Sequence, residues 1–363
     1  MKSPRKSAVA GAFVLLALAI VPLSGGTPQQ STGAAAPQNP PVPQQEQPQA
    51  TVRVRVNEVV VPVIVKDGAG HLVPDLRKDD FRILEDNIEQ RIISFKTDPL
   101  PLSMVVLLDN DLKSKDAQQV AASLDSIVAG LSASDEAFVC RFDQFFHPGK
   151  GFTTDQDKLL TELKRTRLDE QPTVAPPSEP INEGPVINGH SSTGESPKVP
   201  ETSVMIKGQP TKALDDAVYA AAQLLKDRDP DRKRRKIILL ITDGVNAPKF
   251  NTNNYDATIK ELLRNDIAVY GVGVGAAYFS RKFERLSKYC HDSGGDVYYG
   301  LKSRAMEQLY SRVTEEARNQ YTLAYNPTGT DRGLEYHSIE VRVERPGLTI
   351  LTREGYYVSG VSR

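Results

Sequence analysis

Residues 104–109 read MVVLLD and residues 237–244 read IILLITDG, and these two apolar runs decide the fold. Nearly continuous runs of Val, Ile and Leu are typical of strands that are buried on both faces of a parallel sheet. Each run breaks off at an aspartate, Asp109 in the first and Asp243 in the second. Ligands of open α/β sheets bind beyond the carboxyl ends of such strands. The sequence therefore predicts a site with oxygen ligands at that edge of the sheet.

Strand and helix patterns alternate around these runs from residue 101 to residue 319. Further strands are predicted at 136–142, 267–274 and 296–299, and helices at 117–131, 155–166, 213–226, 255–265, 280–291 and 305–319. This alternation predicts an α/β domain with a doubly wound, mostly parallel, Rossmann-like sheet. Residues 169–210 are rich in Pro, Ser, Gly, Glu and Asn and form a long loop insertion. We interpret the loop either as a lid over the strand edge or as a spacer.

Strand patterns of period two flank this domain on both sides. They fill an N-terminal β segment, residues 51–97, and a C-terminal β segment, residues 320–358. Neither segment is large enough to bury a secure core alone. We therefore predict that the two segments pack together as a small β module beside the α/β domain.

The first 50 residues predict export. Residues 1–26 combine a basic start, an apolar run at 8–21 and small residues at 24–26, which is the pattern of a signal peptide. The apolar run is short for a membrane span, so we expect no stable span after cleavage. Residues 27–50 are rich in Pro and Gln and predict a disordered linker. The mature protein is expected in the periplasm or outside the cell.

Composition and motifs exclude several classes of function. A formal net charge of −1 gives no electrostatic basis for nucleic-acid binding. The mixed-charge run at 226–236 is interpreted as a solvated connection between a helix and a strand. The five histidines lack zinc spacing, and no nucleophile elbow or Walker loop is present, so we expect no enzyme. Cys140 and Cys290 are interpreted as two separate buried thiols, with a disulfide as the alternative.

Several short motifs, in their order and spacing, resemble the von Willebrand factor type A domain. More narrowly, the chain is similar to exported acidobacterial proteins that flank this domain with β segments. The resemblance covers roughly residues 57–357. The motifs that carry it are DFRILED at 80–86, IISF at 92–95, PLSMVVLLD at 101–109, TKALDDA at 211–217, TDG at 242–244, VYGVGVG at 269–275 and REGYY at 353–357.

The resemblance implies a metal-ion-dependent adhesion site at the strand edge. In that family, Asp-x-Ser-x-Ser, a Thr before a central helix and a later Asp hold Mg²⁺ or Mn²⁺. Asp109, Thr211 and Asp243 match this pattern, whereas Asp111 and Lys113 stand where the serines should be. A protonated lysine is no metal ligand. Either Asp109, Asp111, Thr211 and Asp243 still bind Mg²⁺ or Mn²⁺, or the site is degenerate, without a cofactor, and Lys113 replaces the cation.

Together these features predict an exported protein that mediates protein–protein interaction or adhesion through the carboxyl-end edge of its sheet. Two alternatives remain open at this point. One is a metal-dependent hydrolase that uses the same edge. The other is a purely structural scaffold of the cell envelope.

Overall fold

The computed structural model describes residues 58–166, 168, 212–229, 231, 233–279, 284–328 and 335–358. All of them belong to the compact unit Arg55–Arg363. The predicted signal peptide, the linker, the start of the first β segment and the 169–210 loop lie outside these residues. Among the helices that are described, none has the length and apolar character needed to cross a membrane.

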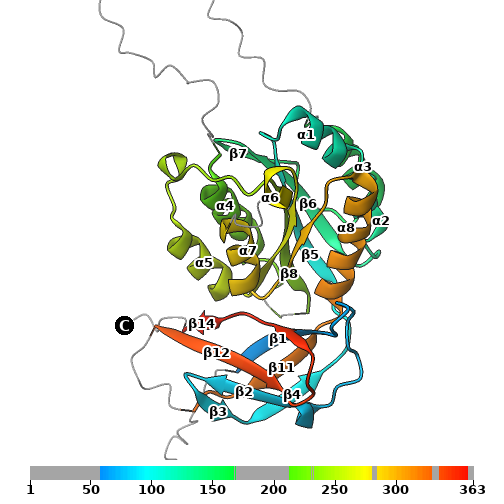
Figure 1. The fold of residues 1–363 in the computed structure, drawn as a ribbon. Coiled ribbons are helices and arrows are strands. Elements are labelled where there is room, and N and C mark those ends of the chain that lie inside the picture. The colour runs from blue at the N-terminus through cyan, green and yellow to red at the C-terminus, as the bar shows by residue number, and fades with distance from the viewer. Residues whose placement is uncertain are drawn as a thin grey trace, which may run out of the picture. The chain divides into compact units, whose positions relative to one another are not determined.

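A six-stranded sheet forms the centre of the α/β domain (Figure 1). Its strand order is β10 (Val297–Tyr299), β9 (Ile267–Gly273), β8 (Arg235–Thr242), β5 (Leu102–Asp109), β6 (Glu136–Phe142) and β7 (Phe146–Pro148). All neighbouring pairs are parallel except β6 and β7. Every residue of β5 is buried, as its apolar sequence predicts. Because β5 and β8 are parallel neighbours, Asp109 and Asp243 reach the same edge of the sheet.

Helices cover both faces of this sheet. One apolar core lies between the sheet and α1 (Ser114–Ala121), α2 (Asp125–Ala129), α3 (Gln156–Lys164) and α8 (Ser303–Arg318). The other lies between the sheet and α4 (Leu214–Lys226), α5 (Tyr255–Arg264) and α7 (Glu284–Asp292). Three single-turn helices complete the α/β domain and its flanks: η1 (Lys78–Asp80), η2 (Pro248–Phe250) and α6 (Ala276–Phe279).

The helical layer differs from the sequence prediction at 117–131, and the structure also decides how the two cysteines are arranged. The single helix predicted at 117–131 is two helices, because the chain turns at Ser123, whose hydroxyl donates to the Val120 carbonyl at 2.7 Å. Cys140 in β6 and Cys290 in α7 are separate, buried free thiols, as predicted. Burial raises the pKa of the Cys140 thiol to about 12.

The two terminal segments form two antiparallel four-stranded sheets with a shared apolar core. The first has the order β13 (Thr349–Leu351), β1 (Val59–Lys66), β11 (Tyr321–Tyr325) and β4 (Ile92–Lys96). The second has the order β14 (Gly355–Tyr357), β12 (Tyr336–Val343), β2 (Phe81–Glu85) and β3 (Ile88–Gln90). Each sheet combines strands from both segments (Figure 1). Neither segment alone can therefore complete either sheet.

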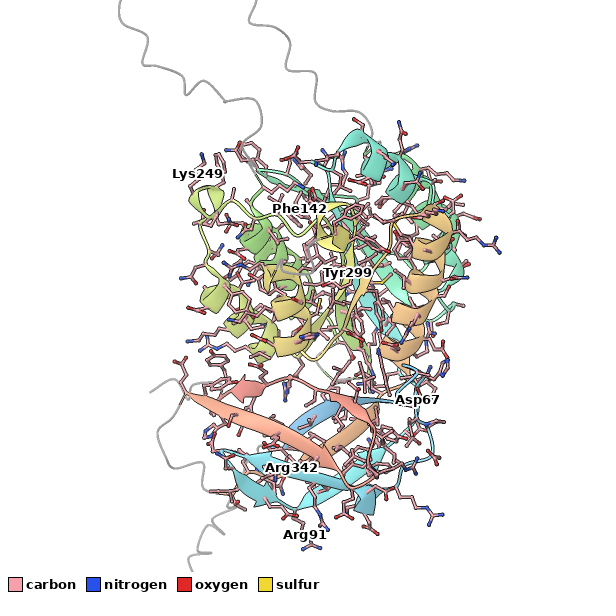
Figure 2. The ribbon with its side chains drawn as sticks, in the orientation of Figure 1. Asp67, Arg91, Phe142, Lys249, Tyr299 and Arg342 are labelled. Carbon is pink, nitrogen blue, oxygen red and sulfur yellow. The ribbon has the colours of Figure 1, made fainter. Side chains whose placement is uncertain are left out.

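Buried ion pairs join this β module to the α/β domain. The Lys66 ammonium on β1 lies 2.5 Å from an Asp296 oxygen and 2.7 Å from Glu316 Oε2. On the other side, Arg353 pairs with Asp266 before β9. Figure 2 shows the side chains that fill both parts, with Phe142 in the α/β domain and Arg342 on β12. The module thus lies at the amino ends of β8 and β9, whereas Asp109 and Asp243 lie at the carboxyl ends of β5 and β8.

Candidate functional site

A lysine ammonium lies between the two strand-ending aspartates. Nζ of Lys212 is 2.9 Å from Oδ2 of Asp109 and 2.8 Å from Oδ1 of Asp243. The Lys212 residue is only 2% exposed, and Asp109 is fully buried. Asp109, Lys212 and Asp243 thus form a buried ion-pair triad at the carboxyl-end edge of the sheet.

The loops around this edge hold the backbone of Lys212 in place. Its carbonyl accepts from the amide of Ala247, in the loop after β8, at 2.8 Å. The next amide, of Ala213, donates to the carbonyl of Asp143, in the loop after β6, at 2.9 Å. Helix α4 begins directly afterwards at Leu214. The backbone that carries the Lys212 side chain is therefore fixed by the loops after β6 and β8 and by the start of α4.

Both carboxylates are also fixed by hydrogen bonds from the strand ends and loops around them. Asp109 Oδ2 accepts from the Thr242 hydroxyl at 2.7 Å, and Oδ1 accepts from the Asp111 amide at 3.0 Å. Asp243 Oδ1 accepts from the Val245 amide at 3.0 Å. The turn after Asp243 needs Gly244, whose φ of 76° lies in the left-handed region. The anionic oxygens are thus preorganised around a cation that the chain itself supplies.

Electrostatics within the triad follow from burial and from charge. Burial disfavours the Lys212 ammonium, but the charges of Asp109 and Asp243 outweigh it and raise the pKa of Lys212. Burial, with the nearby Asp243 charge, raises the pKa of Asp109, although Lys212 acts in the opposite direction. Partial burial and the charges of Asp243 and Asp143 likewise raise the pKa of Asp111.

The structure places the predicted site residues as follows. Asp109 and Asp243 meet, and Asp111 lies beside them with an exposed side chain. Thr211 lies outside the described residues. Lys113 is exposed just before α1, so the lysine in the cation's place is Lys212 and not Lys113. The signal that points to Lys212 is its position beside Thr211, directly before the central helix.

As arranged, these residues do not fit a divalent cation between the two carboxylates. An ammonium donates hydrogen bonds and has no lone pair for a metal. Its contacts of 2.8 and 2.9 Å are charge-assisted hydrogen bonds, whereas Mg²⁺ needs oxygens at about 2.1 Å. The tethered amine therefore takes the electrostatic role that the family pattern gives to a metal.

A second group of metal-type ligands lies in the β module. Ligand atoms of Glu85, Asp86 and His337 all lie within 4.8 Å of one another. They contact each other as they stand: His337 Nδ1 is 2.8 Å from Asp86 Oδ2 and 3.4 Å from Glu85 Oε1. Although burial opposes it, hydrogen bonds from His337 and Ser338 lower the pKa of Asp86. This group links the turn after β2 to β12.

Comparison with known families adds the decisive observation. Residues 199–312 match the family model of the von Willebrand factor type A domain. The chain contains a von Willebrand factor type A domain. The matched range includes Lys212, α4, β8 and Asp243, while Asp109 precedes it. Strand β5, which ends at Asp109, pairs with β8 of the matched range in the same sheet.

Solved structures with detectable similarity are distant. BatB from Bacteroides thetaiotaomicron is 13% identical with a TM-score of 0.39, over 60% of this chain and 98% of its own. A von Willebrand factor type A protein from Catenulispora acidiphila is 9% identical with a TM-score of 0.41, over 83% and 74%. Manganese-loaded TRAP protein from Plasmodium vivax is 13% identical with a TM-score of 0.38, over 74% and 100%. No curated protein matched the sequence.

Proposed function

We propose that this protein is an exported interaction module that binds a protein partner through the carboxyl-end edge of its type A domain without a divalent cation. The observation that carries the proposal is the position of the Lys212 ammonium between Asp109 and Asp243. Type A domains are interaction modules, and the strands that form the carboxyl-end edge of such a domain are present here. The signal pattern of residues 1–26 supports export.

The charge of the edge indicates the chemistry of the partner. In a metal-containing site an open coordination position accepts a carboxylate from the partner. Here the cation is internal and buried, and Asp111 is the exposed group above it. The charged groups that act on Asp111 are the Lys212 ammonium and the carboxylates of Asp243 and Asp143, so carboxylates outnumber the ammonium around Asp111. We therefore propose that the partner presents a lysine or arginine, and not a carboxylate.

We propose a binding function and not catalysis for the same edge. The imidazole of His147 lies 3.0 Å from Asp143 Oδ2, in the loop after β6. Within the described part of the chain, no hydroxyl or thiol forms a hydrogen bond with this imidazole. This arrangement gives no support to a side-chain nucleophile activated by His147 at this edge.

Affinity capture from the envelope fraction of the source cells tests the proposal. We expect partners that remain bound in EDTA and are lost with Asp111→Lys, which reverses the exposed charge. Asp98→Lys is the matched control, because Asp98 is an exposed carboxylate between β4 and β5. Elution of the partners by EDTA would contradict the metal-free site. Equal capture by both variants would contradict the edge as the binding surface.

A further inference from the structure

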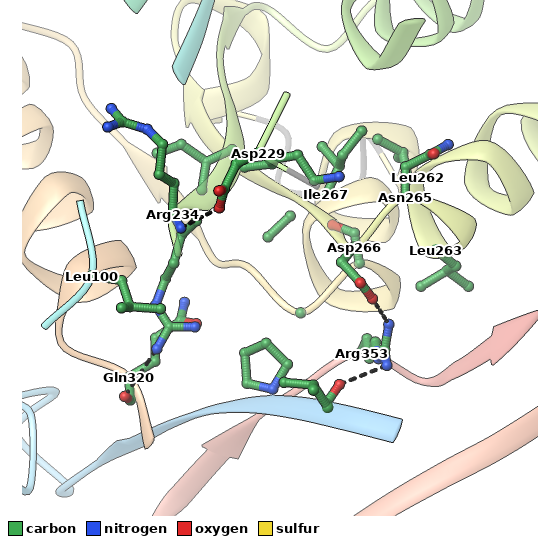
Figure 3. A pocket seen from close by; sticks show the side chains of 18 of the residues that line it. Leu100, Asp229, Arg234, Leu262, Leu263, Asn265, Asp266, Ile267, Gln320 and Arg353 are labelled. Carbon is green, nitrogen blue, oxygen red and sulfur yellow. Dashed lines mark hydrogen bonds and ion pairs between the residues drawn. The ribbon is translucent and has the colours of Figure 1, made fainter. Parts of the chain in front are cut away.

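A second concave site lies at the opposite end of the central sheet. A cavity of about 230 Å³ opens between the amino ends of β8 and β9 and the β module. Figure 3 shows Leu263 and Ile267 on its upper side and Gln320 and Arg353 on its lower side. Its lining combines this apolar surface with five cationic side chains and only two carboxylates. The cavity is therefore partly apolar. Three of the cations pair with carboxylates, Arg234 with Glu136, Arg264 with Glu335 and Arg353 with Asp266.

Arg235, the first residue of β8, is a buried cation in this lining, and none of the described carboxylates pairs with it. It is 7% exposed. Its Nη2 donates to the Gln320 carbonyl at 3.1 Å and to the Thr322 hydroxyl at 2.9 Å, which are both neutral. Its Nε has no acceptor, and within the described residues no carboxylate forms an ion pair with it. Although burial lowers the pKa of Arg235 to about 10, the guanidinium stays protonated at neutral pH.

Arg353 shows what Arg235 lacks. It is 6% exposed and lines the same cavity. Its Nη1 pairs with Asp266, and its Nη2 donates to the Val60 carbonyl at 2.7 Å. The same cavity thus holds Arg353, whose charge is neutralised by Asp266, and Arg235, whose charge is not neutralised. Burying a charge without a counter-charge is costly, so the cavity lacks an anion that would neutralise Arg235.

We infer that this cavity binds a small organic carboxylate, with its charged end on Arg235 and its apolar part against Ile237, Leu263 and Ile267. A carboxylate is planar and matches the donors of a guanidinium. Pockets for drug-sized ligands measure about 300–1,000 Å³, so this smaller cavity suits a compact molecule. The inference is independent of the proposed function, because it concerns the other end of the sheet.

Ligand-dependent thermal stability tests the inference, with benzoate as the probe. A ligand that binds only the folded state raises the melting temperature, by about 2–4 °C at a tenfold excess over its dissociation constant. We expect this rise with benzoate and none with benzamide, the neutral molecule of the same shape. Equal shifts with benzamide, or no shift with benzoate, would overturn the inference. An equal shift with inorganic phosphate would overturn the organic part of it.

The variant Arg235→Met removes the cation and keeps an unbranched apolar side chain. We expect it to abolish the benzoate shift. Arg342→Met is the control, because Arg342 is an exposed arginine on β12 that lies outside the cavity lining (Figure 2). It should keep the full shift. A benzoate shift that persists in Arg235→Met would overturn the assignment of the anchor. If Arg235→Met does not fold, the comparison of benzoate with benzamide on the unaltered protein still decides.

Discussion

The Lys212 ammonium lies 2.9 Å from Oδ2 of Asp109, although the two residues are 103 positions apart in the chain. The same ammonium lies 2.8 Å from Asp243 Oδ1. Three segments of the chain thus meet at one buried charge. In this type A domain, the centre of the carboxyl-end edge of the sheet is an internal salt bridge. The stability of the domain and the proposed binding at this edge should follow from it.

Removing the amine should destabilise the domain strongly. In Lys212→Met, Asp109 and Asp243 face each other in a buried site without a counter-charge. Breaking a buried pair in this way costs about 3–5 kcal/mol in the free energy of unfolding. Urea denaturation measures this loss. Lys113→Met is the matched control, because Lys113 is exposed and should stay within about 0.5 kcal/mol of the wild type. Equal losses in both variants would contradict the internal salt bridge.

Replacing the amine by a hydroxyl should create a dependence on divalent ions. Lys212→Thr removes the cation but leaves both carboxylates and adds an oxygen ligand, which hard cations prefer. We expect Mg²⁺ or Mn²⁺ to raise the melting temperature of this variant and to leave that of the wild type unchanged. The double variant Lys212→Thr with Asp243→Ala should lose the response. A similar shift in the wild type and in Lys212→Thr would argue against the substitution of a metal by Lys212.

Asp135 should make the domain sensitive to acid. Its carboxylate accepts from the amides of Leu102 and Ser132 at 2.7 Å each and pairs with Arg318. Although burial opposes it, these partners lower the pKa of Asp135. Its stabilisation is therefore present above about pH 4, the pKa of a free Asp, and is lost as the pH falls through the lower folded-state pKa.

The variant Asp135→Asn tests this linkage. We expect a loss of about 1–3 kcal/mol in unfolding free energy at pH 7, where the wild-type carboxylate is charged. The difference should shrink as the pH approaches the lowered pKa. Urea denaturation at several pH values measures it, with Asp98→Asn as the exposed control. A difference that is independent of pH would show that the charge of Asp135 is not the cause.

Truncation after residue 319 should expose unpaired strands. Strand β11 lies between β1 and β4, and β12 pairs with β2, so this truncation removes the partners of three N-terminal strands. Exposed strand edges template aggregation. We expect the truncated protein to elute as aggregates in size-exclusion chromatography, while the fragment 101–319 without either β segment stays monomeric. A monomeric, folded 51–319 fragment would contradict the shared architecture.

Much of the fold follows from the periodicity of the sequence. The buried runs before Asp109 and Asp243 predict β5 and β8 to within two residues, because a strand buried on both faces requires continuous apolar residues. The short edge strand β7 and the break at Ser123 were missed. Both depend on hydrogen bonds between particular neighbours, which leave no periodic pattern.

The charged groups were harder to place than the strands. Lys113 was selected because it follows Asp109 in the motif, whereas Lys212 reaches the site from a distant loop that only the tertiary fold brings near. Arg235 lies within the charge run at 226–236, which predicts a solvated connection, yet it begins β8 and is buried under the β module. Burial of a long charged side chain depends on what packs over it, and a single sequence does not show this.

Titration of the wild-type protein with Mn²⁺ in an isothermal calorimeter tests the central claim most directly. With Lys212 between Asp109 and Asp243, the account predicts no saturable heat in the micromolar range, and a binding signal only in Lys212→Thr. A micromolar binding isotherm for the wild type that Asp243→Ala abolishes would contradict it.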